Sequence, residues 1–517
     1  MAKAKKQVIH KWWTLTVVSA ATFMLILDIT IVNVAIPSIQ HSLNPTFAAV
    51  QWIVDAYSLA LATIVLNAGS LADRYGRKKL FMLGIAIFTI ASAVCGGATT
   101  PLMLDISRAV QGIGGGIMFA TSLSLLAQDF HGKERGIAFG IWGAVTGAAI
   151  AIGPLLGGLI TNYLTWRWIF YVNLPIGILT LVITGLRLRD SRNVKETKTD
   201  WPGAIVLSGA LFCLVLGLIE ANEWGWHSDT IVSLFAGAAI LMVCFLGIEA
   251  YTKQPILDLK LFRKPSFTGA QIAAIGISAS IFSLFLYITL YFQDILGMSA
   301  LQAGIRFLPV TVVAFVVAAI SGRLSSVVPG RLMIGIGLLL VAIGLAISYG
   351  VTVDTGWTHL LPGLIVSGFG IGMINPSLAN VAIGVVPPQE SGMASGVNNT
   401  FRQIGIAGGI AVLGALFQLS IRNTLNNSVL AQHLNANQLS NVTSAVSGGE
   451  SSLVIKSSPQ QYKEVVASVT HHAFITGFNE LLIVTSLIAL VGAIFSFAMI
   501  RRKDMATYNY SGPTAHA

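Results

Sequence analysis

Apolar residues fill this chain in long runs that short polar segments separate. We distinguish 14 such runs, which begin near residues 14, 50, 80, 102, 136, 166, 202, 229, 266, 301, 331, 359, 397 and 477. A helix of about 20 apolar residues crosses the roughly 30 Å hydrocarbon core of a bilayer. The alternating segments of a transmembrane barrel, each about 10 residues long, do not occur. The pattern therefore predicts an all-α polytopic membrane protein with 14 transmembrane helices.

The composition agrees with this class. Of the 517 residues, 54% are hydrophobic and only 10% are charged, which excludes an ordinary soluble domain and a disordered chain. No sequence of the form GxxxxGK[ST] is present, so we expect no ATP hydrolysis and an ion gradient as the energy source. Cysteine and histidine show no metal-ligand spacing, and we expect no metal and no cofactor.

The distribution of positive charge predicts the orientation. With both termini placed in the cytoplasm, the cytoplasmic segments hold all but six of the 31 Lys and Arg residues. The six are Arg108, Arg167, Arg306, Arg422, Lys456 and Lys463. This is the asymmetry of the positive-inside rule. We therefore assign the net charge of +10 to orientation in the plasma (inner) membrane and to contact with membrane lipids, and expect no nucleic-acid partner.

One acid, Asp28, lies in the middle of the first apolar run, within LDITIVNVAIP. A charge at this depth costs several kcal/mol and usually serves ion or substrate movement. At about 100° per residue, Thr30, Asn33 and Pro37 share a stripe nearly opposite Asp28. We expect Asp28 to face inward and Asn33 to make interhelical hydrogen bonds, although the sequence permits the reverse.

The loop between the second and third runs reads GSLADRYGRKK. Composition alone favours a solvated, positive-inside turn. The spacing also suits a conformational latch, because Gly69 permits close helix approach and Asp73 can pair with Arg77. The latch residues are Gly69, Asp73, Arg74, Gly76 and Arg77. The pattern GxLADRxGRK resembles the signature loop of the major facilitator superfamily, which implies two six-helix bundles that alternate in exposing a central substrate site.

The fourth run contains RAVQGIGGG, in which Arg108, Gly112 and Gly115 share a stripe. A buried guanidinium needs a partner, whereas Arg108 could also reach outward to the membrane interface. The segment resembles the superfamily's fourth helix, whose arginine is implicated in proton transfer. Asp28 lies about 14 Å, Arg108 about 9 Å and Asp55 about 8 Å from the outer ends of their helices. We predict that these three residues form one proton-coupling cluster.

A glycine-lined face marks the fifth run, and it ends in GPLLGG. Such a face suits tight packing in general and a rocking interface in particular. It resembles the antiporter motif of exporters, here Gly143, Gly147, Gly153, Pro154, Gly157 and Gly158. Three further strings, LDITIVNVAIP, TWRWIFYVNLPIG and SGMASGVNNTFRQIG, resemble the 14-span drug:proton antiporter family.

The chain repeats itself at an offset of 256 residues: Gly112, Gly114 and Gly116 recur as Gly368, Gly370 and Gly372. We therefore expect an N-terminal six-helix bundle over residues 1–187 and a C-terminal bundle over 266–517. Two inserted helices and their linkers would occupy 188–265, and a long external loop about 421–476. Arg108 has no basic counterpart, because position 364 is leucine. The coupling charges thus concentrate in the first half.

The resemblance implies a proton-coupled antiporter that exports amphipathic or cationic drugs by alternating access. The partners would be protons, small molecules and lipids, and a monomer is expected. Candidates for the substrate cavity are Asp28, Asn33, Gln111, Tyr287 and Asn398. Arg402 lies near the inner surface, where a positive-inside role is about as plausible as a functional one. The alternatives are an exporter of an endogenous lipid, peptide or metabolite, and a scaffold or sensor without transport.

Overall fold

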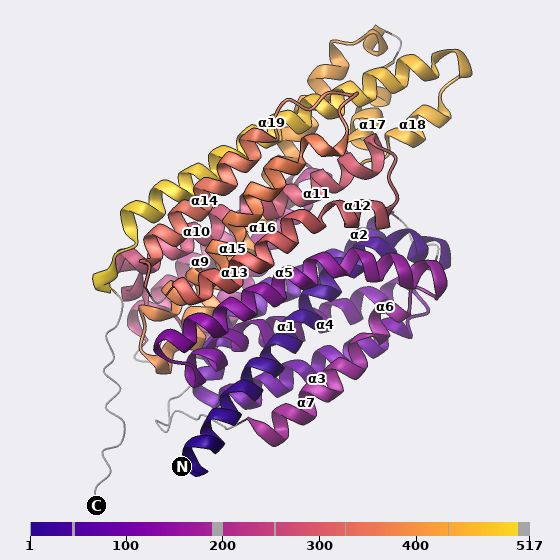
Figure 1. Ribbon diagram of the computed structural model, residues 1–517. Helices are drawn as coiled ribbons and strands as arrows, with labels where there is room; N and C mark the ends of the chain where they lie inside the picture. The colour runs from indigo at the N-terminus through magenta and orange to yellow at the C-terminus, as the bar shows by residue number, and fades with distance from the viewer. Residues whose placement is uncertain are drawn as a thin grey trace, which may run out of the picture.

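The computed structural model describes residues 2–43, 47–188, 200–252, 255–325, 327–432 and 434–504, and every regular element in these ranges is a helix. The first bundle comprises α1 (Ala2–Leu43), α2 (Phe47–Tyr75), α3 (Arg77–Gly96), α4 (Pro101–Asp129), α5 (Gly132–Tyr163), α6 (Trp168–Tyr171) and α7 (Asn173–Arg187). It packs lengthwise against a second bundle (Figure 1). The start of α1 and the end of the last helix lie at the same end of the molecule, which we call the terminal end; the opposite end is the loop end.

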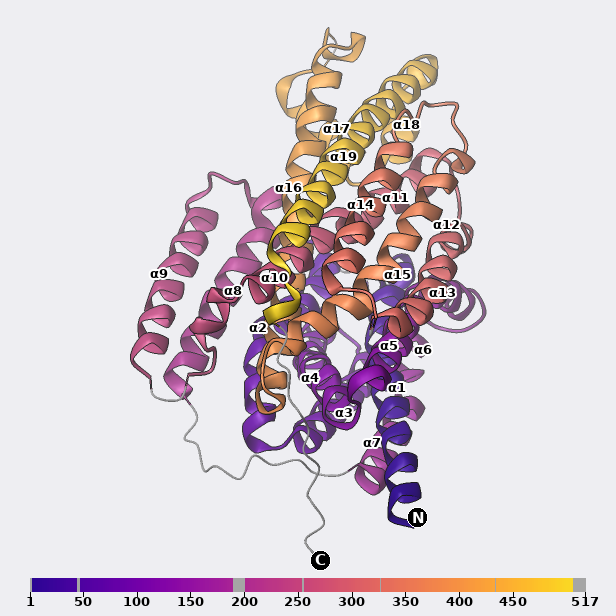
Figure 2. The same ribbon diagram turned by 60° about the vertical axis from the view of Figure 1, so that its left-hand side comes forward.

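The second bundle follows two inserted helices, α8 (Trp201–Trp224) and α9 (Asp229–Tyr251). These two stand at one flank (Figure 2), where α8 contacts α2 and α16. The bundle contains α10 (Pro265–Ile277), α11 (Ser283–Leu290), α12 (Ala300–Arg306), α13 (Leu308–Leu324), α14 (Gly330–Ile347), α15 (Leu361–Gly384), α16 (Ser391–Asn426) and α19 (Lys463–Met499). Two short π-helical segments, Ser278–Phe282 and Tyr291–Ile295, flank α11. At the loop end lie α17 (Ala436–Ser447) and α18 (Ser451–Ser457).

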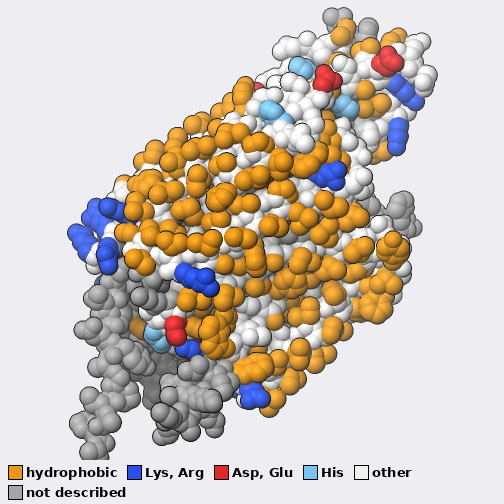
Figure 3. Space-filling model, viewed as in Figure 1, with side chains coloured by type: hydrophobic (Ala, Val, Ile, Leu, Met, Phe, Trp, Pro, Cys, Tyr) orange, Lys and Arg blue, Asp and Glu red, His pale blue; other side chains and the backbone are white. Residues whose placement is uncertain are grey.

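The expected membrane spans are largely present. Among the described residues, 13 helices are long and apolar enough to cross a membrane, and Leu308–Leu324 is an apolar helix of shorter length. Hydrophobic side chains cover the middle of the visible face, whereas charged ones gather toward its two ends (Figure 3). The boundaries differ in several places: the runs near residues 166, 266 and 301 each divide into more than one helix, and α1, α16 and α19 begin earlier than their apolar cores. Polar residues that hydropathy assigns to loops continue these helices.

The sequence repeat corresponds to equivalent helix contacts. Gly112 lies against the backbone of Tyr57 on α2, and Gly368 lies against the backbone of Val310 on α13. Gly114 approaches α3 in the same way that Gly370 approaches α14. A side chain at any of these positions would collide with a neighbouring helix, so the glycines set the close packing of each bundle.

Candidate functional site

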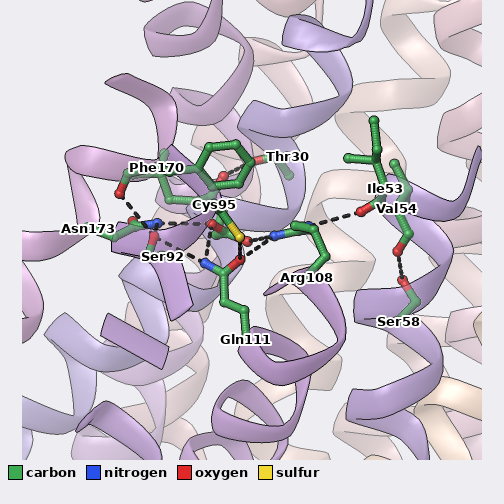
Figure 4. A network of polar contacts seen from close by, with 12 residues as sticks. Thr30, Ile53, Val54, Ser58, Ser92, Cys95, Arg108, Gln111, Phe170 and Asn173 are labelled. Atoms are coloured by element: carbon green, nitrogen blue, oxygen red, sulfur yellow. Dashed lines mark hydrogen bonds and ion pairs between the residues drawn. The ribbon is translucent and has the colours of Figure 1, made fainter. Parts of the chain in front are cut away.

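Asp28 lies inside the first bundle, where it is 0% exposed. Arg108 Nη1 donates to Asp28 Oδ2 at 2.5 Å. Gln111 Nε2 and Asn173 Nδ2 donate to the other oxygen, Oδ1, at 2.8 and 2.9 Å. The carboxylate thus accepts from α4 and α7, and Figure 4 shows Arg108, Gln111 and Asn173 converging on one place. A buried ion pair persists when such hydrogen bonds replace the lost hydration.

Arg108 is 1% exposed, and its guanidinium is held on several sides. Its Nε donates to the carbonyl of Ile53 on α2 at 2.9 Å, and its Nη1 also donates to Gln111 Oε1 at 2.8 Å. The ring of Tyr57 lies 4.3 Å from its Cζ. Gly112 allows α2 to approach Arg108 this closely, because a Cβ at position 112 would collide with the backbone of Tyr57 and push α2 away. The expectation that a buried Arg108 needs a partner is confirmed, and the partner is Asp28.

Three residues of this network were not anticipated. Asn173 at the start of α7 and Ser92 on α3 join it, and Asn173 Nδ2 and Gln111 Nε2 both donate to Ser92 Oγ, at 3.0 and 3.2 Å. The third residue is Cys95, whose Sγ lies 3.6 Å from Gln111 Oε1. The available signal for Asn173 was an amide within the apolar string TWRWIFYVNLPIG. Ser92 and Cys95 offered no signal, since small residues are common in packed membrane helices.

Asp55 does not join this cluster, and that prediction is wrong. The Ile53 side chain packs with Ile31 of α1 and Leu104 of α4, and Asp55, two positions further along α2, projects about 200° away from it. Its electrostatic neighbours are Glu220 and Glu223 on the inserted helix α8. Glu220 is only 4% exposed. Asp28 and Asp55 therefore lie in two separate places, Asp28 inside the first bundle and Asp55 near the α8 acids.

The candidate cavity residues do not line a common space. Asp28 and Gln111 are enclosed in the first bundle, so the expectation that Asp28 faces a central cavity is not met in this conformation. Tyr287 donates to the Ile410 carbonyl at 3.2 Å, and Asn398 Nδ2 donates to Gln271 Oε1 at 3.1 Å, both within the second bundle. The side chain of Asn33 lies outside the described residues.

The latch residues join the two bundles at the terminal end. Asp73 pairs with Arg77, as predicted, with Nη2 and Oδ1 2.7 Å apart. The same carboxylate accepts from the backbone amides of Gly392 and Met393 on α16, at 3.1 and 2.9 Å. Arg77 Nη2 donates to the Pro388 carbonyl at 2.5 Å. Asp73 thus receives the first amides of a helix, where partial positive charge favours an anion.

Close backbone contact supports this latch. Gly69 lies against Gly392, and a Cβ on either glycine would collide with the backbone carbonyl of the other. Gly76 has a φ of 106°, a conformation that glycine adopts without steric cost, and it forms the turn between α2 and α3. Arg74 Nη2 donates to the Pro255 carbonyl at 3.0 Å. This hydrogen bond attaches the loop before α10 to α2.

The glycine face of α5 divides between two neighbours. Gly143 lies beside Asn375 and Pro376 of α15, Gly147 faces the Thr311 carbonyl, and Gly158 faces Leu301 of α12. These three positions meet the second bundle. The flanking glycines, Gly153 and Gly157, instead lie against Thr30, Ile31 and Val34 of α1. The side chain of Pro154 is outside the described residues. One face of α5 thus forms the interface between the halves, while another seats α1.

No group of three His, Cys, Asp or Glu side chains in the described ranges could hold a metal ion. The described arrangement offers a buried carboxylate paired with a guanidinium inside the first bundle, and hydrogen bonds that link the two bundles at the terminal end.

Residues 18–410 match the family described as the Major Facilitator Superfamily. The chain is 31% identical over 496 residues to the tetracenomycin C resistance and export protein of Streptomyces glaucescens, covering 95% of this chain and 92% of that protein. It is 36% identical to the puromycin resistance protein of Streptomyces alboniger, with 79% of this chain and 82% of that protein covered. The structure resembles that of the proton:xylose symporter XylE, with a TM-score of 0.61 at 13% identity over 96% of this chain and 97% of that one.

Proposed function

Since the chain belongs to the major facilitator superfamily, we propose that it is a proton-coupled antiporter, which exports amphipathic small molecules by alternating access. Its curated relatives are drug resistance and export proteins, so the chain is a membrane efflux transporter and not an enzyme. The coupling ion and the direction of exchange are the proposed part.

The buried Asp28–Arg108 pair is the observation that carries the proposal. Asp28 is the carboxylate at the centre of the first bundle, and its ligands come from α4 and α7, while Arg108 also bonds α2. Protonation neutralises Asp28 and removes its attraction for the guanidinium. Arg108 must then find other acceptors, because an unpaired buried charge is costly. One proton can therefore alter the packing of several helices.

Substrate and proton need not meet at one carboxylate. Asp28 is 0% exposed and accepts three side-chain hydrogen bonds, so a drug has no direct access to it in this conformation. We therefore place the substrate between the two bundles and the proton within the first one. Coupling then runs through the packing of α4 and α5. Asp55, beside Glu220 and Glu223, provides a second and separate candidate for a proton site.

The closed latch supports alternating access. Asp73 and Arg77 join the bundles at the terminal end, which this proposal assigns to the cytoplasm. For the site to open there, the Gly69–Gly392 contact and these hydrogen bonds must separate. A proton gradient suffices for such cycling: it supplies roughly 2.3 kcal/mol per charge at 100 mV and about 1.4 kcal/mol per pH unit.

Ligand-induced stabilisation at two pH values tests the function. The Tm of the purified protein is measured with and without each candidate antibiotic. A compound that binds the folded state raises Tm by mass action. We expect an exported compound to raise Tm more at the higher pH, because in a proton antiporter substrate and proton bind alternately and each lowers the affinity for the other. A compound that raises Tm equally at both pH values, together with no flux in proteoliposomes, would instead support a scaffold or sensor.

We expect the terminal end to face the cytoplasm. Tyr462, 48% exposed at the loop end, and Arg502, exposed at the terminal end, are each replaced by cysteine after Cys95, Cys213 and Cys244 are removed. A membrane-impermeant maleimide should label Tyr462→Cys in intact cells. It should label Arg502→Cys only in permeabilised cells. The reverse pattern would invert the assigned orientation.

A further inference from the structure

Arg402 lies inside the bundle and not at its terminal end. It is ten residues beyond Gly392, the latch contact on α16, which places it about 15 Å further along the helix. A positive-inside anchor would lie at the membrane surface, within reach of water. The position of Arg402 therefore requires another explanation.

The contacts of Arg402 place it between the two halves of the protein. Its Nη2 donates to Asn375 Oδ1 on α15 at 3.1 Å. Asn375 lies beside Gly143 of α5, on the interface with the first bundle. Asn399, one helical turn before Arg402, donates to the Phe119 carbonyl of α4 at 3.4 Å. Arg402 thus sits where α15 and α16 of the second bundle meet α4 and α5 of the first.

This guanidinium has no acidic partner. Among the described residues no carboxylate forms a salt bridge with Arg402, in contrast to Arg108, whose charge Asp28 balances. Within the described ranges its guanidinium makes one hydrogen bond, to the neutral amide of Asn375, although a guanidinium has five N–H donors. The centre of the interface therefore carries an uncompensated positive charge.

The side chain of Arg402 is partly exposed. Arg135 and Arg306 have guanidinium nitrogens that are fully buried without a partner. The nitrogens of Arg402 that lack a partner are not buried in this way, and its side chain remains partly exposed. A planar fork of charged donors at the interface between the two halves is suited to a carboxylate or a similar anion.

We propose that Arg402, oriented by Asn375, binds an acidic oxygen of the transported molecule, so that the protein prefers anionic amphiphiles to cationic ones. This assignment rests on the proposed function, which it refines by giving the substrate a charge. It replaces the expectation of cationic drugs, because the central acid, Asp28, is already neutralised by Arg108. A cation between the halves would meet the charge of Arg402 with no free acid beside it.

Two dyes with the same ring system and opposite charge test the proposal. Fluorescein is anionic and rhodamine 6G is cationic, and both share a xanthene core. Binding to the purified full-length protein is measured by fluorescence anisotropy. We expect the wild type to bind fluorescein more tightly, and Arg402→Gln to weaken fluorescein at least about tenfold, since charge-assisted hydrogen bonds are lost. Rhodamine 6G binding should stay unchanged or strengthen.

Arg422→Gln is the matched control. Arg422 is exposed on the same helix, 20 residues away, so this variant removes one positive charge from α16 without touching the interface. Its affinities for both dyes should equal those of the wild type. If Arg402→Gln does not fold, Asn375→Asp keeps the arginine and places a carboxylate beside it, and it should likewise weaken fluorescein selectively.

The proposal is overturned if a folded Arg402→Gln or Asn375→Asp variant binds fluorescein as the wild type does. It is equally overturned if both dyes weaken together or if the wild type prefers rhodamine 6G. Because binding is measured without a gradient, the proposed function can fail separately. In that case fluorescein binding depends on Arg402 while no dye moves in response to protons.

Discussion

Asp28→Asn is expected to abolish transport driven by a pH gradient. The amide keeps an oxygen that can accept from Arg108, Gln111 or Asn173, but it cannot alternate between a charged and a neutral form. It also leaves the buried Arg108 charge uncompensated, and removing one partner of a buried pair costs about 3 to 5 kcal/mol. Gradient-driven dye efflux from proteoliposomes measures the effect.

Two further variants separate coupling from folding. The double variant Asp28→Asn/Arg108→Gln removes both charges, so it should be more stable than Asp28→Asn and remain uncoupled. Asp105→Asn changes an acid on α4 that lies outside the network, and it should transport normally. Gradient-coupled efflux at the wild-type rate in Asp28→Asn would refute the role assigned to this carboxylate.

Gly69→Ala is expected to open the terminal end. The new Cβ would collide with the Gly392 carbonyl and lie 3.1 Å from Gly396 Cα, so α2 and α16 must separate. The bonds from the Gly392 and Met393 amides to Asp73 would then be lost, each contributing about 1.5 to 3 kcal/mol as a hydrogen bond to a charged group. This is enough to reduce the closed population at least about tenfold.

Spin labels at Tyr75→Cys on α2 and Gln389→Cys beside α16 report the opening as a longer interlabel distance in a cysteine-free background. Gly247→Ala is the control, because a Cβ at Gly247 on α9 meets nothing within 4 Å. It should leave the distance and the transport rate unchanged. An unaltered distance in Gly69→Ala would show that the Gly69–Gly392 contact does not hold this end closed.

The fold was largely predictable because the apolar runs and the glycine repeat can be recognised from the order of residues alone. The apolar runs predicted most of the spans, of which 13 are long and apolar enough among the described residues, and the repeat of Gly112 as Gly368 predicted equivalent contacts in the two halves. Depth in the membrane followed from counting residues. The latch was predictable as well, since Asp73 and Arg77 are one helical turn apart and their pairing is local.

The rotation of each helix about its axis was not predictable from depth. Asp55 and Arg108 have similar depths, yet Asp55 lies near the α8 acids because α2 packs the side chain of residue 53 with α1 and α4. Asn173 and Ser92 enter the network through the packing of α7 and α3 against α1 and α4, which no local pattern specifies. The sequence predicts Arg402 near the surface for a related reason: its apolar run starts near residue 397, whereas α16 begins at Ser391.

Simultaneous recording of dye flux and internal pH in proteoliposomes tests the central claim of proton antiport. Fluorescein and rhodamine 6G are each supplied to liposomes that hold a pH gradient, with protein-free liposomes as the reference. Proton antiport predicts that a transported dye moves against the proton flow and dissipates the gradient, and that a protonophore stops net accumulation. A dye flux that neither requires the gradient nor consumes it would contradict the account.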